Sequence, residues 1–97
     1  MNPLPSSPQL RAGMFGRVWV ARGRHRAIAV PESAVVRRGQ IEAVFVVARG
    51  QARLRIVRIG RAAEGRAEVL SGLRAGEAVV VTHAERLVDG QRVAVNR

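Results

Sequence analysis

Few side chains in this sequence are of the types that carry out covalent or metal chemistry. The two histidines, His25 and His83, lie far apart in the sequence. His83-Ala84-Glu85 matches the H-x-E fragment of zinc deaminases, but the second motif of those enzymes needs two cysteines and the chain has none. The serines do not stand in G-x-S-x-G, and the glycines form no phosphate-binding motif. We therefore predict that the protein is not an enzyme and binds no cofactor and no metal.

Arginine is the residue type from which this sequence could build a binding surface. All 17 basic residues are arginine and the formal net charge is +10, which favours an anionic partner such as nucleic acid, anionic lipid or an acidic protein face. A G+C-rich coding bias would produce the same excess of arginine without a function. The arginines are densest in one stretch, and the candidate contact residues are Arg37, Arg38, Arg49, Arg53 and Arg55.

Binding of RNA or single-stranded DNA is one interpretation of this basic stretch. Proteins that bind single strands combine a basic groove with aromatic side chains on which the bases stack. Phe45 shares an apolar face with Ile41 and Val47, which indicates a core position, so Trp19 is the only free aromatic candidate. A small basic β-barrel that binds nucleic acid is therefore the alternative to a module that binds protein.

Short strands separated by glycine-containing turns must position these arginines. Apolar and β-branched residues recur with the two-residue period of strands, and no segment of ten or more residues has the apolar period of a helix. Strands are expected at residues 14–22, 26–30, 41–48, 51–59, 66–70, 78–82 and 92–95, with extended chain at 34–37. The sequence predicts an all-β fold, a small β-barrel or sandwich of six to seven short strands with one or two short helical turns.

Two of the expected strands have unusual patterns. Ile41–Ala48 is apolar on both faces, which predicts a central strand covered on both sides. Gln51–Ile59 alternates at first and then changes phase, because Val57 and Ile59 are both apolar. A shift of one residue exchanges the two faces of a strand, so we expect a β-bulge near Ile56-Val57.

The tripeptide Arg-Gly-Gln occurs twice, at residues 38–40 and 49–51, on either side of the expected central strand. Such a spacing fits two hairpin turns and needs no sequence duplication. We expect Gly39 and Gly50 to adopt positive φ where the chain reverses. Whether the arginine before each glycine meets a partner protein, a polyanion or only water is left open by the sequence.

Other residues mark helical turns and chain reversals. Pro31 is expected at the first position of a short helical turn. Thr82 and Glu85 have the spacing of a capping box, which predicts a second short helix through Leu87. The remaining predicted turn residues are Gly76, Asp89 and Gly90.

Four short motifs follow one another along the chain. They are L-R-A-G-M at residues 10–14, V-P-E-S-A-V at 30–35, G-L-R-A-G-E-A-V-V at 72–80 and L-V-D-G at 87–90. In this order and spacing they resemble the C-terminal end of periplasmic adaptor proteins, the membrane fusion proteins of tripartite efflux pumps of the resistance-nodulation-division (RND) type. The family has proline at the position of Ala12.

This resemblance implies a non-catalytic docking module. It divides the chain into a flexible leader at residues 1–9, a remnant of the β-barrel domain at 10–25 that holds its last strand, and a membrane-proximal-like β domain at 26–97. The implied partners are the periplasmic domain of the inner-membrane RND pump and other adaptor subunits, with no small-molecule ligand. Sheet edges and arginine-rich loops would meet an acidic or polar face of the pump.

The resemblance also implies a periplasmic location at the inner membrane. The sequence has no signal-peptide pattern, which by itself predicts a cytoplasmic chain, and it has no apolar run long enough to span a bilayer. The adaptors use an N-terminal strand to complete this domain, and without it we expect an open sheet edge and a homo-oligomer. A truncated gene product, a split subunit, a fragment of a longer reading frame and an orphan domain all fit the sequence.

Overall fold

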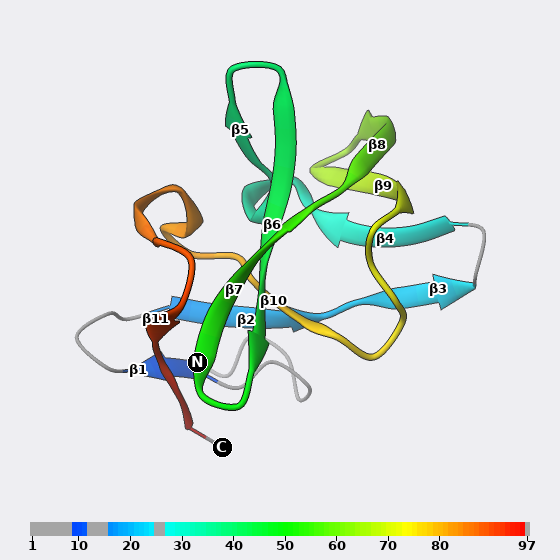
Figure 1. The fold of residues 1–97 in the computed structure, drawn as a ribbon. Helices are drawn as coiled ribbons and strands as arrows, with labels where there is room; N and C mark the ends of the chain where they lie inside the picture. Colours follow the sequence, from blue (N-terminus) through cyan, green and yellow to red (C-terminus); the bar gives the residue numbers. More distant parts are fainter. Residues whose placement is uncertain (1–8, 12–15, 25–26, 97) are drawn as a thin grey trace.

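The computed structural model describes residues 9–11, 16–24 and 27–96, and their regular structure is almost entirely β (Figure 1). The expected all-β fold class is confirmed. The strands are β1 (Gln9–Arg11), β2 (Gly16–Val20), β3 (Arg22–Arg24), β4 (Ala27–Pro31), β5 (Val36–Arg38), β6 (Ile41–Ala48), β7 (Gln51–Ile56), β8 (Arg58–Ala63), β9 (Arg66–Ser71), β10 (Ala78–Val80), β11 (Gln91–Arg92) and β12 (Ala94–Asn96). They are shorter and more numerous than the six to seven expected, because segments predicted as one strand divide between two sheets.

The strands form two antiparallel sheets. The larger, eight-stranded sheet has the order β11-β7-β6-β10-β2-β1-β12, and β5 pairs with β6 beside this path. The smaller, four-stranded sheet has the order β3-β4-β9-β8. In Figure 1 the β5, β6 and β7 hairpins run vertically through the middle of the molecule, and the four strands of the smaller sheet lie to their right.

Two strands continue from the larger sheet into the smaller one with a single residue between the sheets. β2 passes into β3 at Ala21 and β7 passes into β8 at Val57, and we call these residues the Ala21 crossing and the Val57 crossing. The β6–β7 ladder has no bulge at Ile56-Val57, since the change of phase there marks a change of sheet. A register shift follows directly, between Arg58 and Ile59 in the β8–β9 pair. The first strand was predicted to end at residue 22, but the chain stays extended through β3, with Gly23 inside that strand at a φ of 134°.

The core has two parts, separated by β6. Val44 and Val46 face a cluster shared with the smaller sheet, while Phe45 faces the other way, toward Val18, Val80 and Leu87. The expectation that this central strand is covered on both sides is confirmed for its middle residues, which are buried. Ile41 was expected on the inward face with Phe45, but its side chain is 51% exposed because it lies at the turn end of β6.

Both helical segments are single 3-10 turns. The first, η1 (Glu32–Ala34), begins one residue after Pro31, which is extended with φ −60° and ψ 145°. The second, η2 (Ala84–Arg86), lacks the expected capping box: its N-cap is His83, and no side chain caps it. The Thr82 hydroxyl instead accepts a hydrogen bond from the Arg17 N–H of β2 at 3.3 Å, so it is used to join η2 to the sheet.

The N-terminal residues are part of both sheets. β1 pairs with β12 and β2, β2 pairs with β10, and β3 pairs with β4. Of the predicted leader, residues 1–8 lie outside the described residues, and Gln9 is the first residue of β1. The predicted barrel remnant at residues 10–25 therefore supplies strands to the same sheets as the rest of the chain.

Candidate docking surface

The hairpins β5–β6 and β6–β7 carry all five arginines predicted to contact a partner. Arg37 and Arg38 end β5 at one turn, whereas Arg49 lies in the turn at the opposite end of β6 (Figure 1). An eight-residue strand spans roughly 26 Å. The five arginines therefore do not form one surface, and each must be considered by its own contacts.

The two Arg-Gly-Gln copies occupy different positions in their turns. Arg38 pairs with Ile41, so the first turn consists of Gly39, with φ 63°, and Gln40. Ala48 pairs with Gln51, so the second turn consists of Arg49, with φ 53°, and Gly50, with φ 76°. Two successive residues with positive φ are the geometry of a type I′ hairpin turn. Arg49 thus stands at the tip of its turn, while Arg38 remains inside a strand.

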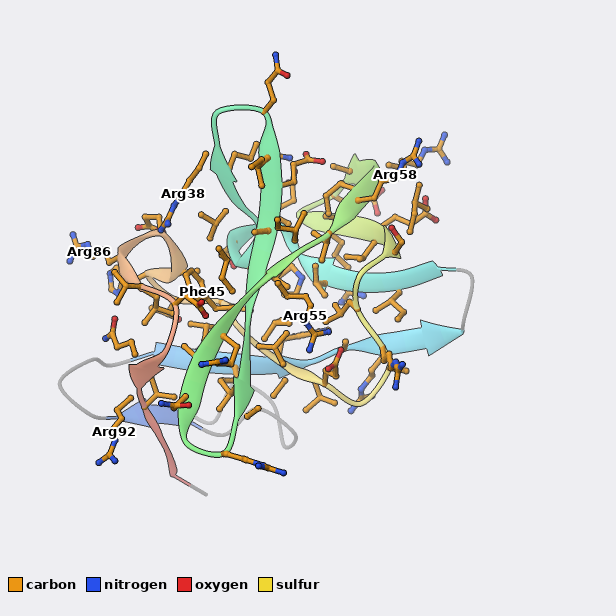
Figure 2. All side chains as sticks on the ribbon, viewed as in Figure 1. Arg38, Phe45, Arg55, Arg58, Arg86 and Arg92 are labelled. Atoms are coloured by element: carbon orange, nitrogen blue, oxygen red, sulfur yellow. The ribbon has the colours of Figure 1, made fainter. Side chains whose placement is uncertain are left out.

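The Arg38 side chain points back onto η2 (Figure 2). Its Nη2 donates to the main-chain oxygens of Leu87 at 3.2 Å and Glu85 at 3.4 Å, and its guanidinium lies 6.0 Å from the centre of the Phe45 ring. Carbonyl groups at a helical end attract cations, so this contact stabilises η2. The neighbouring Arg37 makes one ion pair with Glu42, 3.3 Å long.

Arg55 is the most firmly bound of the five arginines. It donates two hydrogen bonds to the Glu77 carboxylate, at 2.9 and 3.1 Å, and a third to the Gly72 carbonyl at 3.1 Å. Partial burial raises the pKa of Glu77, but the hydrogen bonds from Arg55 and from the Arg74 N–H outweigh this effect and hold that pKa below its ordinary value. A bidentate pair of this kind fixes two side chains, so Arg55 is a structural residue.

The last residue of β9 and the connection to β10, which together we call the 71–77 segment, join this ion pair to both crossings. A Cβ atom on Gly72 would lie 2.5 Å from the Ile56 carbonyl oxygen, next to the Val57 crossing. At the other crossing, Ala21 donates to the Glu77 carbonyl at 2.7 Å and accepts from the Gly76 N–H at 2.8 Å. The 71–77 segment therefore holds the two sheets together from outside.

The remaining predicted contacts, Arg49 and Arg53, are exposed. Arg92 of β11 is opposite Gln51 and is also exposed, and Gln51 shares a face of β7 with Arg53. We call Arg49, Arg53 and Arg92 the turn-end cluster, and among the described residues none of these three side chains has a hydrogen bond or ion pair. Sequence analysis missed Arg92, since only the strand register brings it beside Arg53.

The predicted turn residues near this cluster have structural partners. The Asp89 carboxylate accepts a hydrogen bond from the Leu54 N–H of β7 at 2.9 Å, and the Gly90 N–H donates to the Ala52 carbonyl at 2.7 Å. Gly90 has a φ of 88° and Gly76 a φ of 94°. Asp89-Gly90 thus covers the outer edge of β7 just before β11 begins.

The two described aromatic side chains are not placed for base stacking. Phe45 is fully buried in the core. Trp19 is half-buried against the cluster shared by the two sheets, with the Arg66 guanidinium 5.4 Å from its ring centre and its Nε1 atom buried. Within the described residues there is also no group of three or more acidic or histidine side chains placed to hold a metal ion. No helix there is long and apolar enough to cross a membrane.

Comparison with protein families decides what kind of domain this is. Residues 27–95 match a family model described as the C-terminal permuted SH3-like domain of YknX. The chain belongs to this family. The YknX C-terminal domain comes from a membrane fusion, adaptor-type protein, which confirms the resemblance to the C-terminal end of adaptors drawn from the four motifs. No curated protein and no solved structure matches the chain. The family match begins after β3, so β1, β2 and β3 extend the YknX-type domain at its N-terminal side.

Proposed function

We propose that this chain is a non-catalytic docking domain of an adaptor protein, and that it binds the periplasmic domain of an inner-membrane efflux pump. The observation that carries the proposal is the match of residues 27–95 to the C-terminal domain of an adaptor-type protein. The four sequence motifs favour a pump of the RND class and a periplasmic location at the inner membrane. Other adaptor subunits are the second class of partner.

The turn-end cluster is the proposed contact surface for the pump. Arg38 and Arg55 are engaged by backbone carbonyls and by Glu77, so withdrawing them would destabilise the domain. Arg49, Arg53 and Arg92 are exposed and can bind acidic side chains of a partner without breaking an internal contact. Guanidinium groups bind carboxylates in a bidentate geometry, which suits an acidic pump surface.

The test is a binding measurement between the full chain and the periplasmic domain of an RND pump from the same genome. The double variant R53Q/R92Q should weaken binding about tenfold, mainly through a slower association rate and a changed salt dependence. The control R17Q/R86Q removes the same charge from exposed residues outside the cluster and should bind as the unchanged chain does. An equal loss of affinity in both variants would mean that binding depends only on the net charge of the chain, and would overturn the proposed surface.

The same proteins test the nucleic-acid alternative. A single-stranded oligonucleotide that binds at about 50 mM salt and is released steeply toward about 200 mM would support it, because phosphate contacts release counterions. The described aromatic side chains argue against it, since neither Phe45 nor Trp19 offers a stacking face. We expect no such binding.

A further inference from the structure

The outer edge of β8 is the longest open strand edge in the described part of the chain. β8 has six residues and pairs only with β9, with register shifts between Arg58 and Ile59 and between Ile59 and Ala62, so its regular end is at Ala62-Ala63. The other strands that pair on one side have two or three residues. All of its residues are exposed except Ile59, which is half-buried. Such an edge presents main-chain donors and acceptors to any extended segment that approaches it.

The edge of β8 differs from that of β7 in how it is protected. On β7, the outward N–H of Leu54 donates to the Asp89 carboxylate, and the outward carbonyl of Ala52 accepts from the Gly90 N–H. On β8, Ala63 pairs with Arg66 directly before a two-residue turn, so the N–H and C=O of Ala62 face outward. No described residue covers them. β8 is therefore open to strand pairing where β7 is not.

The charges beside this edge select the partner. Arg58 and Arg61 are exposed on β8 and have no carboxylate partner among the described residues. Glu68 on β9 is directed to the main chain, since it lies 3.5 Å from the Arg61 N–H. A mostly apolar hollow, lined by Ala29, Ala63, Arg61 and Arg66 among others, lies alongside and could receive a small side chain.

A second copy of this chain is a poor partner for β8. Pairing two β8 edges would place four guanidinium groups, two from each chain, along one two-stranded ribbon. Like charges opposite each other destabilise a strand pair, and charged edge residues are a common protection against self-association. An acidic segment would meet the same arginines with opposite charge.

We infer that β8 is a strand-addition site for an extended, acidic segment of a partner protein. Main-chain hydrogen bonds at Ala62 and its neighbours would supply affinity. The register shift between Ile59 and Ala62 lets Arg58 and Arg61 share one face of β8, where carboxylates of the partner would supply specificity. The site belongs to the smaller sheet and uses none of the turn-end cluster, so it goes beyond the proposed pump contact and stands or falls separately.

The probe is a fluorescein-labelled peptide of alternating glutamate and valine, six residues long, with a lysine–valine peptide as its charge-reversed counterpart. Each is titrated into the full chain, with anisotropy as the measure of binding and ¹H–¹⁵N spectra as the measure of location. The glutamate peptide should bind and shift the amide signals of residues 58–63. A version N-methylated along one edge should lose at least about tenfold in affinity, because it cannot complete the ladder.

Two variants make the test specific. The affinity of R58E/R61E for the glutamate peptide should fall by about tenfold or more, and its affinity for the lysine peptide should rise. An unfolded variant cannot produce this reversal. R53Q/R92Q should bind the glutamate peptide as the unchanged chain does, so failure of the pump contact is distinguishable from failure of this site. Unchanged binding by R58E/R61E, shifts confined to residues outside β8, or self-association through β8 without peptide would each overturn the inference.

Discussion

The two crossings both join the larger sheet to the smaller one, but different contacts stabilise them. At the Val57 crossing the side chain is buried in the core shared by the sheets, and its N–H donates to the Glu42 carbonyl of β6 at 2.9 Å. At the Ala21 crossing the side chain is buried in the same core but is small, and both main-chain groups bond to Gly76 and Glu77. Beyond the core that both share, one crossing is bonded to its own hairpin and the other to a segment more than fifty positions along the chain.

The difference explains why only one crossing leaves a mark in the sequence. A strand that changes sheet through a large buried side chain shows a change of phase in its apolar residues, as at Ile56-Val57. A strand held through backbone groups needs only a small residue, and Ala21 is not distinguished from its neighbours. The 71–77 segment contacts both crossings, so the ion pair between its Glu77 and Arg55 of β7 couples them.

Removal of residues 1–26 eliminates the Ala21 crossing and should have the largest effect on stability. It removes β1, β2 and β3, including the buried side chains of Val18 and Ala21, and leaves β10 unpaired along the edge that Val79 and Val80 now share with β2. We expect residues 27–97 to show no cooperative urea transition, although they contain the whole family match.

A synthetic peptide of residues 9–24, added in excess, should restore the transition if these strands act by pairing. Circular dichroism and tryptophan fluorescence follow the recovery, since Trp19 is the only tryptophan and is supplied by the peptide. Cooperative unfolding of residues 27–97 alone would show that the smaller sheet does not need the Ala21 crossing.

Gly72→Ala sharpens the comparison at the Val57 crossing. The added Cβ would lie 2.5 Å from the Ile56 oxygen and 3.0 Å from the Val57 Cα, at a φ of 97° that alanine disfavours. We expect the free energy of unfolding to fall by about 3 kcal/mol, as the segment must move off the crossing.

Gly65→Ala is the matched control for Gly72→Ala. Its φ is 78°, but nothing lies within 4 Å of the added Cβ, so only the conformational strain remains. Urea denaturation should give a loss of about 1 kcal/mol for this variant. Equal losses for the two variants would mean that the close packing of Gly72 on Ile56 is unimportant.

Local patterns predicted the all-β fold, the bounds of β6 and the glycine turns, because these depend on neighbouring residues. The candidate site was predicted less well, because an arginine side chain has the same local pattern whether it is free or bound. Arg38 and Arg55 are engaged by residues 17 to 49 positions away, and Arg92 joins the turn-end cluster only through the β7–β11 register. The Thr82–Glu85 capping box failed for a similar reason, since Arg17 of β2 takes the hydroxyl.

The Arg55–Glu77 pair is the link between the crossings, and a double-mutant cycle measures it. Arg55→Gln and Glu77→Gln should each lower the free energy of unfolding by about 1–2 kcal/mol, with a coupling between them of about 1 kcal/mol. The Arg37–Glu42 pair is the control: it has a single contact of 3.3 Å and more exposed side chains, so its coupling should stay under about 0.5 kcal/mol. Equal coupling in the two pairs would remove the special role of the 71–77 segment.

The pH dependence of the stability of Glu77→Gln distinguishes the contribution of the Glu77 charge from that of its shape. We expect this change in stability to be the smallest of those predicted. The carboxyl pKa of Glu77 is lower in the folded protein than its ordinary value of 4.5, after the hydrogen bonds from Arg55 and the Arg74 N–H have outweighed the opposing effect of burial. A lowered pKa of Glu77 stabilises the fold above pH 4.5, and this contribution is lost as the pH falls through the pKa of the folded protein.

Urea denaturation of both proteins from about pH 6 down to about pH 2.5 should therefore show that the variant's deficit in unfolding free energy shrinks on the acid side. The other carboxylate in an ion pair with arginine among the described residues, Glu42, cancels in this difference, because its ion pair is the same in both proteins. A deficit that stays constant over the whole range would mean that glutamine fails at this position through its shape, and that the charge of Glu77 does not hold the crossings together.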